Sequence, residues 1–325
     1  MRIMGLPRLL LAALAGCLLL AGCGSGPSQV RAAVLIGDQE VSVDQVQQLI
    51  DNAVADQPAA RQLAQQHKLD LLGREIVRQL VLHELLGRAA QREHLTADPS
   101  LVADARNLLT QPVSTNSTDP SELAASIVAH ARSADYASDR ALEQQLGTKY
   151  FDKVAVSVDY LVISTDDANA KPVTRRTQAL DTAQQMAASP NGAAQVLQKA
   201  EAAGQQAITG QQQVPGQAPD FQSMVLFGVP AGTVVAFQPS SETYWVTAVV
   251  RASGPSTAAA NAGTEPPVQA QYIAFGLRLL QPYLAEAGVK INPRYGVWDP
   301  VSMNLAPSAA ETTGAVLPVK GNAQP

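Results

Sequence analysis

The stretch Lys68–His94, KLDLLGREIVRQLVLHELLGRAAQREH, is the longest part of the chain that combines helical periodicity with an absence of proline. At about 100° per residue, its first apolar side chains share one stripe: Leu69, Leu72, Ile76 and Leu80, with Val77 at the edge. Leu82, Leu85 and Leu86 then fall on the opposite side. Because a surface helix needs one apolar face, we predict that this helix contacts neighbours on two sides. A central core helix and the wall of a binding cradle both fit this pattern.

The composition sets the class of protein. The chain has 325 residues, of which 46% are hydrophobic and 16% charged, a length that favours about two domains. The net charge of −5 and the absence of a polybasic run give no reason to expect a nucleic-acid partner. No glycine-rich phosphate loop is present. His83-Glu84 begins like the zinc motif HExxH, but Gly87 stands where the second histidine is needed. We therefore predict no cofactor and no metal.

The N-terminus carries the pattern of an export signal. Arg2 and Arg8 flank the start of a short apolar run, Leu9–Leu20, which is too short to remain as a membrane-spanning helix. Leu20-Ala21-Gly22-Cys23 follows, and this tetrapeptide resembles the bacterial lipobox. The resemblance implies that residues 1–22 are a lipoprotein signal peptide and that Cys23 carries the lipid, a palmitate-type anchor to a bacterial membrane on its extracytoplasmic side. Residues 23–32 are then a tether.

Residues 33–150 read as a helical domain that is preceded by a strand, Ala33–Ile36. Ser42 and Gln45 have the spacing of a capping box, and Asp98 and Asp119 each stand before a proline at the start of a helix.

Residues 154–253 change to a mixed pattern, so the fold class is α+β. Val154–Ser164 alternates like a strand, and two Ala/Gln-rich helices follow at about 173–188 and 192–203. Loops rich in glycine, glutamine and proline come next, and then the strands Thr233–Phe237 and Tyr244–Ala252. We interpret residues 254–267 as a linker and 268–298 as a helix and strand that return to the first domain. The Ala/Thr/Pro-rich residues 299–325 are predicted to be a disordered tail.

This order of parts resembles the SurA/PrsA family of extracytoplasmic foldases. The matching segments are Ala33–Asp38 (AVLIGD), Leu69–Leu95 followed by Thr96-Ala97-Asp98, Val158–Val162 (VDYLV), Phe227–Val235 (FGVPAGTVV) and Tyr244–Val249 (YWVTAV). The resemblance implies a mainly helical, chaperone-like domain that N- and C-terminal strands close, with an inserted parvulin-like α+β domain.

The chain departs from the family at the parvulin active site. That site contains a pair of histidines on adjacent strands, and the corresponding positions here hold Tyr160 and Trp245. All four histidines lie outside the insert: His67, His83, His94 and His130. The apolar parts that remain are Phe221, Met224 and Phe227. The resemblance therefore implies a degenerate parvulin pocket formed by Tyr160, Phe221, Met224, Phe227 and Trp245, and no catalytic residue.

We therefore predict a membrane-anchored extracytoplasmic chaperone that holds unfolded or exported polypeptides without ATP. Leu82, Leu85 and Leu86, on the second apolar side of the long helix, are the predicted client surface. Two other functions remain open: an active peptidyl-prolyl isomerase that works without histidine, and a structural adaptor of the cell envelope.

Overall fold

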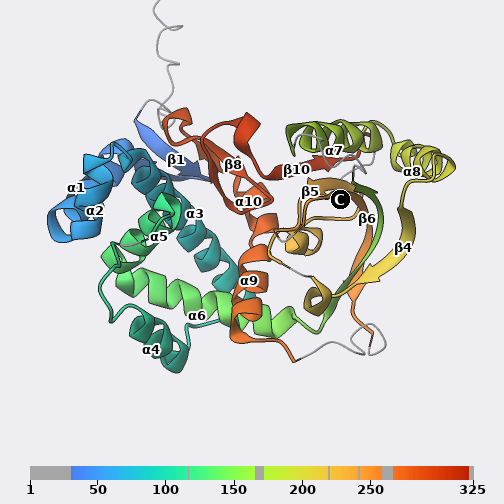
Figure 1. Cartoon of the computed structure of the whole chain (residues 1–325). Coiled ribbons are helices and arrows are strands. Elements are labelled where there is room, and N and C mark those ends of the chain that lie inside the picture. The colour runs from blue at the N-terminus through green and yellow to red at the C-terminus, as the bar shows by residue number, and fades with distance from the viewer. Residues whose placement is uncertain are drawn as a thin grey trace, which may run out of the picture.

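The computed structural model describes residues 31–115, 117–164, 172–218, 220–240, 242–257 and 266–321. The predicted signal peptide, Cys23 and most of the predicted tether lie outside the described residues. The chain has an α+β fold with two parts, which we call the helical lobe (residues 31–150 and 266–306) and the sheet lobe (residues 154–257 and 309–321) (Figure 1). In the described ranges, no helix has the length and hydrophobicity needed to cross a membrane.

The helical lobe is built around α3 (Leu69–Glu93), the helix that the long periodic stretch predicts. Its apolar side chains are buried on both sides, so the prediction of neighbours on two sides is confirmed. The other helices of this lobe are α1 (Val43–Asp56), α2 (Pro58–Gln65), α4 (Pro99–Leu108), α5 (Pro120–Ala131), α6 (Ser133–Tyr150), α9 (Gln269–Arg278) and α10 (Gln281–Ala287).

Local side-chain bonds fix where several of these helices begin. The side chain of Ser42 accepts from the Gln45 amide at 3.1 Å, and the Ser42 amide donates to the Gln45 side chain at 2.8 Å. This reciprocal pair is the predicted capping box at the start of α1. Asp98 and Asp119 cap α4 and α5, and each accepts from the backbone N–H of a serine two residues later at 2.8 Å.

A small sheet joins the two ends of the helical lobe. Its strand order is β2-β1-β7, from β1 (Ala32–Ile36), β2 (Gln39–Ser42) and β7 (Lys290–Ile291). Val34 pairs with Ile291, which confirms that a C-terminal strand returns to the first strand. Asn292 extends the contact, because its backbone N–H donates to the carbonyl of Ala33 at 2.9 Å.

The sheet lobe contains an antiparallel sheet with the order β10-β5-β6-β3-β4. Its strands are β3 (Val154–Ile163), β4 (Ala207–Gln213), β5 (Thr233–Phe237), β6 (Trp245–Pro255) and β10 (Gly314–Pro318). The helices α7 (Pro172–Ala187) and α8 (Gly192–Ala202) cover one face. The 3-10 turn η2 (Ser223–Phe227) and α9 pack on the opposite face.

The C-terminal residues correct two predictions. Residues 299–321 are ordered: β8 (Val297–Asp299) pairs with β9 (Asn304–Ala306), and β10 pairs with β5 along its whole length. The predicted disordered tail is therefore wrong, because backbone pairing and the buried side chain of Asp299 hold this segment. The Asp299 carboxylate accepts from the backbone amides of Val301, Ser302 and Thr313 and from the Thr313 hydroxyl. The predicted linker begins too early, since β6 continues to Pro255; residues 258–265 lie outside the described ranges.

Within the helical lobe, α6 crosses α9, and the crossing is close because each helix presents a glycine. A methyl group on Gly147 would collide with the carbonyl oxygen of Tyr272, and one on Gly276 would collide with the carbonyl oxygen of Glu143. The helix backbones are therefore in direct contact, and any larger residue must push them apart.

We predict that Gly147→Ala and Gly276→Ala each lower the free energy of unfolding by about 1–3 kcal/mol, the usual range for an overpacked contact. The matched control is Gly87→Ala in α3, where nothing lies within 4 Å of the added methyl group. That exposed change is expected to stabilise the chain by up to about 1 kcal/mol, because alanine favours a helix over glycine. Chemical denaturation measures all three, and equal effects at Gly147 and Gly87 would contradict the close crossing.

Candidate functional site

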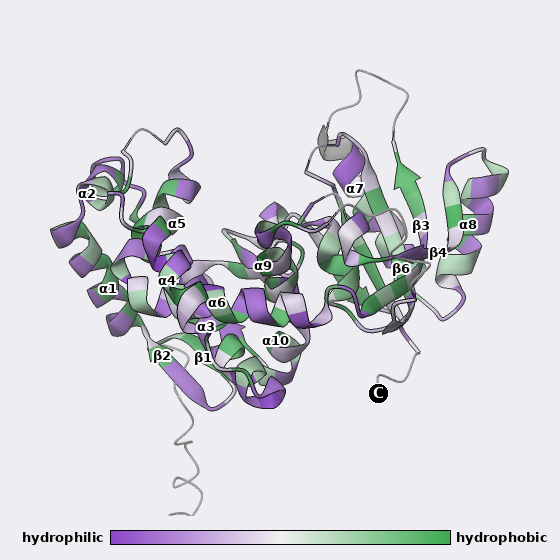
Figure 2. Cartoon of the chain, turned by 90° about the horizontal axis from the view of Figure 1, so that it is seen from below, coloured by the Kyte–Doolittle hydropathy of each residue, from purple (hydrophilic) through white to green (hydrophobic). Residues whose placement is uncertain are grey.

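A cavity of about 430 Å³ lies on the face of the sheet that carries η2. Its floor comes from alternate residues of β3 and β6, namely Tyr160 and Val162 with Val246 and Ala248. Both strands are largely hydrophobic (Figure 2). Leu226 and Phe227 of η2 form a wall. A cavity of this volume is within the range of small-ligand pockets in proteins.

None of the described residues that line this cavity carries a charge. The lining consists of Val158, Tyr160, Val162, Ser164, Gln206, Gln213, Gln217, Ala218, Ser223, Leu226, Phe227, Phe237, Tyr244, Val246 and Ala248. Burial raises the pKa of the Tyr160 phenol. Burial, followed by Glu242 and Tyr160, raises the pKa of Tyr244. Both phenols are therefore neutral at pH 7, and the described lining offers hydrogen bonds and apolar surface but no group that exchanges a proton near neutral pH.

The structure divides the five residues of the predicted parvulin pocket. Tyr160 and Phe227 line the cavity. Met224 of η2 is 2% exposed and belongs to the core on this face. The guanidinium carbon of Arg278 lies 4.4 Å from the centroid of the Phe221 ring. Trp245 is buried on the other face of the sheet, under α7 and α8. Placing Phe221, Met224 and Trp245 in the pocket is therefore wrong.

Strand alternation explains the error at Trp245. Trp245 pairs with Ile163 of β3, and both side chains belong to the core under α7 and α8. Tyr160 stands opposite Ala248, so the cavity face of β6 presents Val246 and Ala248. The aromatic residue that reaches the cavity is Tyr244, one position earlier. The signal was present in the sequence, because residues an even number of positions apart in a strand share a face.

Arg278 of α9 holds the wall of the cavity in place. Its guanidinium donates to the carbonyl of Phe221 at 3.1 Å and to the carbonyls of Pro300 and Val301 at 2.8 and 2.7 Å. It also donates to the side chain of Gln281 at 2.9 Å. Burial lowers the pKa of Arg278 to about 9, so the side chain is still charged at neutral pH. One buried cation thus joins the segment before η2 to the helical lobe and to the C-terminal segment.

Comparison with solved structures adds a weak likeness. No family model matches the chain, and no curated protein matches its sequence. A crystal structure of the foldase protein PrsA from Lactococcus lactis aligns with a TM-score of 0.23 and 11% sequence identity, over 80% of this chain and 94% of that chain. A likeness of that size carries no argument about function.

Leu82, Leu85 and Leu86 do not form a surface. They are 5%, 0% and 1% exposed and belong to the core of the helical lobe. The prediction that they bind clients is wrong for the folded chain, because α5, α6, α10 and the first sheet surround α3. The two-sided apolar pattern fits a central core helix and a groove wall equally well, and here it marks the core helix.

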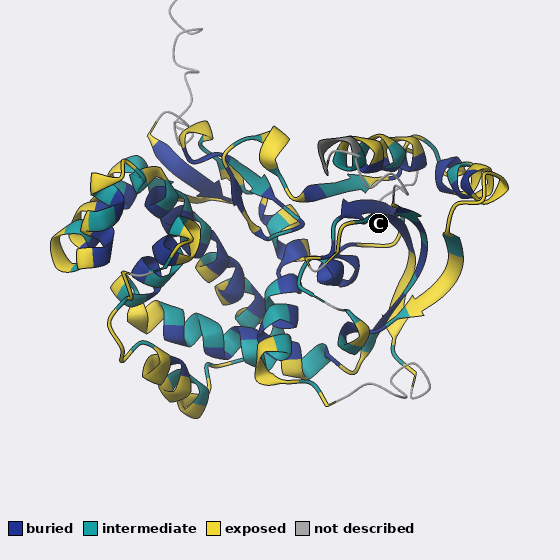
Figure 3. Cartoon of the chain, in the orientation of Figure 1, coloured by how far each residue is buried: buried dark blue, intermediate teal, exposed yellow. Residues whose placement is uncertain are grey.

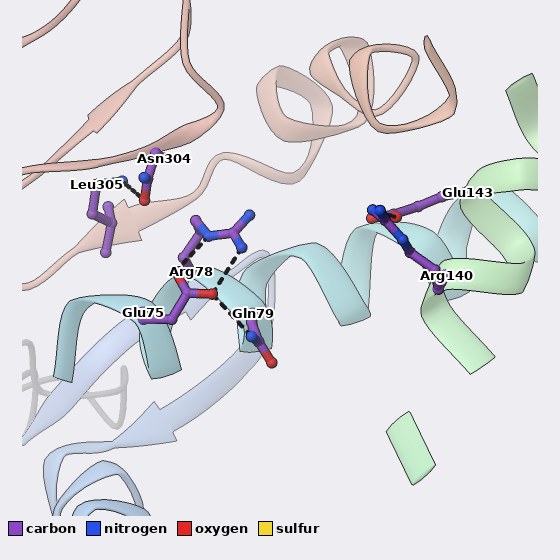
Figure 4. A network of polar contacts seen from close by, with 7 residues as sticks. All are labelled: Glu75, Arg78, Gln79, Arg140, Glu143, Asn304 and Leu305. Carbon is purple, nitrogen blue, oxygen red and sulfur yellow. Dashed lines mark hydrogen bonds and ion pairs between the residues drawn. The ribbon is translucent and has the colours of Figure 1, made fainter. Parts of the chain in front are cut away.

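Buried polar groups accompany these leucines where α3 meets α6. Glu75 accepts from Arg78 at 2.8 Å and from Gln79 at 2.9 Å (Figure 4). Arg140 lies 3.5 Å from Glu143 on α6. Glu143 also lines a cavity of about 150 Å³ together with Leu82, Leu86 and Leu277 of α9, among others.

The pKa of Glu143 is raised to about 7, first because the side chain is buried and also because Asp139 is near; the cations Arg140 and Arg78 oppose this rise. Nearby, His83 of α3 lies 2.8 Å from Asp139 of α6, and this hydrogen bond raises the pKa of His83. Both groups therefore hold a proton more tightly in the folded chain than in the unfolded chain. Their contribution to stability is present at low pH and is lost as the pH rises through their folded pKa values.

We predict that Glu143 contributes less to the free energy of unfolding as the pH rises. Its contribution should decrease by up to about 3 kcal/mol from about pH 4.5 to pH 7. Glu143→Gln keeps the shape of the side chain without its charge, so the variant should lose less stability than the wild type between pH 5 and pH 8. Glu201→Gln, at an exposed position of α8, is the matched control and should follow the wild type. Urea unfolding at both pH values measures the difference. Parallel pH profiles of the wild type and Glu143→Gln would contradict the account.

Proposed function

We propose that this protein is an extracytoplasmic, membrane-anchored chaperone that holds exposed apolar segments of exported polypeptides without ATP. The observation that carries the proposal is the uncharged cavity of about 430 Å³ on the sheet, with Tyr160, Phe227 and Tyr244 in its lining. Unfolded chains differ from folded ones by the apolar side chains that they expose, and an uncharged concave surface binds such side chains by removing them from water.

The expected affinity suits holding and release. Complete burial of one large apolar side chain contributes roughly 1.5–3 kcal/mol, and immobilising the bound segment offsets part of it. One cavity of this size therefore binds weakly and releases its client without an energy source. Glutamine and serine side chains in the lining, such as Gln213, Gln217 and Ser223, offer hydrogen bonds to the backbone of the bound segment.

The lining gives no support to proline isomerisation as the main activity. An isomerase must lower a rotation barrier of about 18–20 kcal/mol. The described residues of the cavity include two neutral phenols and no histidine, and all four histidines of the chain belong to the helical lobe. We therefore propose binding without catalysis.

The test is suppression of aggregation of a reduced, unfolded model protein. Replacing Tyr160 and Tyr244 together by alanine removes two aromatic side chains from the cavity and should weaken suppression several-fold. Leu108→Ala is the matched control, because Leu108 is 71% exposed on α4 and lies far from the sheet in the fold. The control should suppress aggregation like the wild type.

Folding of the double variant is checked first by circular dichroism and urea unfolding. Full suppression by a folded double variant would reject the cavity as the holding site. If the wild type isomerises proline tetrapeptides and Tyr160→Ala abolishes this activity, the protein is an isomerase instead. Recovery of a single stoichiometric envelope partner, with no binding of unfolded chains, would establish an adaptor.

The membrane anchor is the second part of the proposal. Cys23 follows Leu20-Ala21-Gly22 and is the attachment point that we propose for the lipid. Cys23→Ala should leave no lipid attachment site, so the protein should lack the mass of the acyl groups and no longer be anchored as a mature lipoprotein. An unchanged mass and unchanged partitioning in the variant would reject the anchor.

A further inference from the structure

The outer edge of β4 is open. β4 is the last strand of the order β10-β5-β6-β3-β4 and pairs with β3. Within the described ranges, no strand pairs with its other side. The strand is largely exposed and lies at the rim of the sheet lobe (Figures 1 and 3). An unpaired edge presents backbone N–H and C=O groups that another extended chain can use.

The sequence of β4 contains none of the residue types that commonly block strand addition. Its sequence, AITGQQQ, contains no charged residue and no proline. The opposite edge differs, because β10 ends in Pro318, which has no backbone N–H to donate. Charged residues and proline are the common devices that prevent strand addition, so the two edges of this sheet are not equivalent.

A bulge limits how much of β4 another strand can follow. Gly210 has a φ of 66°, and the register with β3 shifts between Val158 and Tyr160. On the inner side, Asp159 fixes the bulge: its carboxylate accepts from the Gly210 amide at 2.7 Å and from Arg251 at 2.6 Å. Two bulged strands cannot pair regularly with one another, which disfavours a second copy of this chain as the occupant. A flexible extended segment can adapt to the bulge.

The edge and the cavity are continuous. Gln206, directly before β4, and Gln213, its last residue, both line the cavity. Tyr160, on the cavity floor, pairs with Ile208 of β4. Side chains on one face of a strand added to β4 would therefore lie beside the mouth of the cavity. Because neither the edge nor the described lining carries a charge, a charged segment would lose hydration without gaining a partner.

We infer that β4 accepts an extended, uncharged segment of the client as an added strand, and that alternate side chains of this segment enter the cavity. The inference rests on the proposed function and specifies its substrate class and binding mode. Backbone hydrogen bonds make such binding tolerant of sequence, while the cavity selects apolar side chains. The short pairing that the bulge permits keeps the binding reversible.

The experiment uses the full mature chain and two peptides of nine residues, acetylated and amidated, in which threonine alternates with leucine. The second peptide is N-methylated at two adjacent central residues, so that each edge of the peptide loses a backbone donor. Binding is measured by calorimetry, and hydrogen exchange of β4 is followed with and without peptide. The exchange of β10, the other edge of the sheet, is the internal control.

The inference predicts that the unmodified peptide binds at least about tenfold more tightly than the methylated one, a loss equivalent to roughly 1.4 kcal/mol, and that it slows exchange in β4 but not in β10. Equal binding of both peptides, with both weakened by Tyr160→Ala, would overturn strand addition and leave the holding cavity in place. Absence of any binding, together with no suppression of aggregation, would overturn both proposals. A last control omits the peptide. If exchange in β4 then slows as the protein concentration rises, the edge pairs with a second copy of the chain, and the inference is overturned.

Discussion

The close crossing of α6 and α9 is the contact on which the rest of the structure depends. Because Gly147 and Gly276 bring the two backbones together, α9 is held against α6, and Phe275 of α9 joins the core that packs on the sheet lobe. Phe275 of α9 packs edge-on against Phe151 and Phe227, with ring centroids 5.5 and 5.9 Å apart. The helical lobe therefore supplies the support behind one wall of the cavity, and the site depends on both lobes.

The chain also interlocks the lobes through its ends. β7 returns to pair with β1, while β10 continues past the helical lobe to complete the large sheet beside β5. Arg278 adds a further link, because its guanidinium donates to the carbonyl of Phe221 in the sheet lobe and to the carbonyl of Val301 in the helical lobe. The sheet lobe is consequently not a self-contained insertion. Its outermost strand on one side comes from the end of the chain, and the free strand on the other side is β4.

The sequence predicted the parts of the fold that local patterns determine. Thr233–Phe237 was predicted with its observed bounds because β-branched and aromatic residues fill it, and Ser42, Asp98 and Asp119 marked helix starts through local hydrogen bonds. The sequence does not predict the strands β4 and β10, because backbone pairing with distant segments holds them in place. β4 is rich in glutamine, and β10 lies in an Ala/Thr/Pro-rich stretch, so neither has the composition of a typical strand. At the site, Tyr160 and Phe227 were identified from resemblance. Identifying Tyr244 as a cavity residue requires the register of β6 with β3. Predicting the burial of Leu82 requires knowing which elements pack against α3.

The central claim is that unfolded clients bind in the cavity on the sheet. A photoreactive benzoyl-phenylalanine in place of Tyr244 tests it most directly, with the same residue in place of Leu108 as the comparison. Each variant is irradiated with one model protein, first unfolded and then native. The account predicts crosslinks from position 244 to the unfolded form, few to the native form, and few from position 108. Equal crosslinking from the two positions, or crosslinks from position 108 alone, would contradict it.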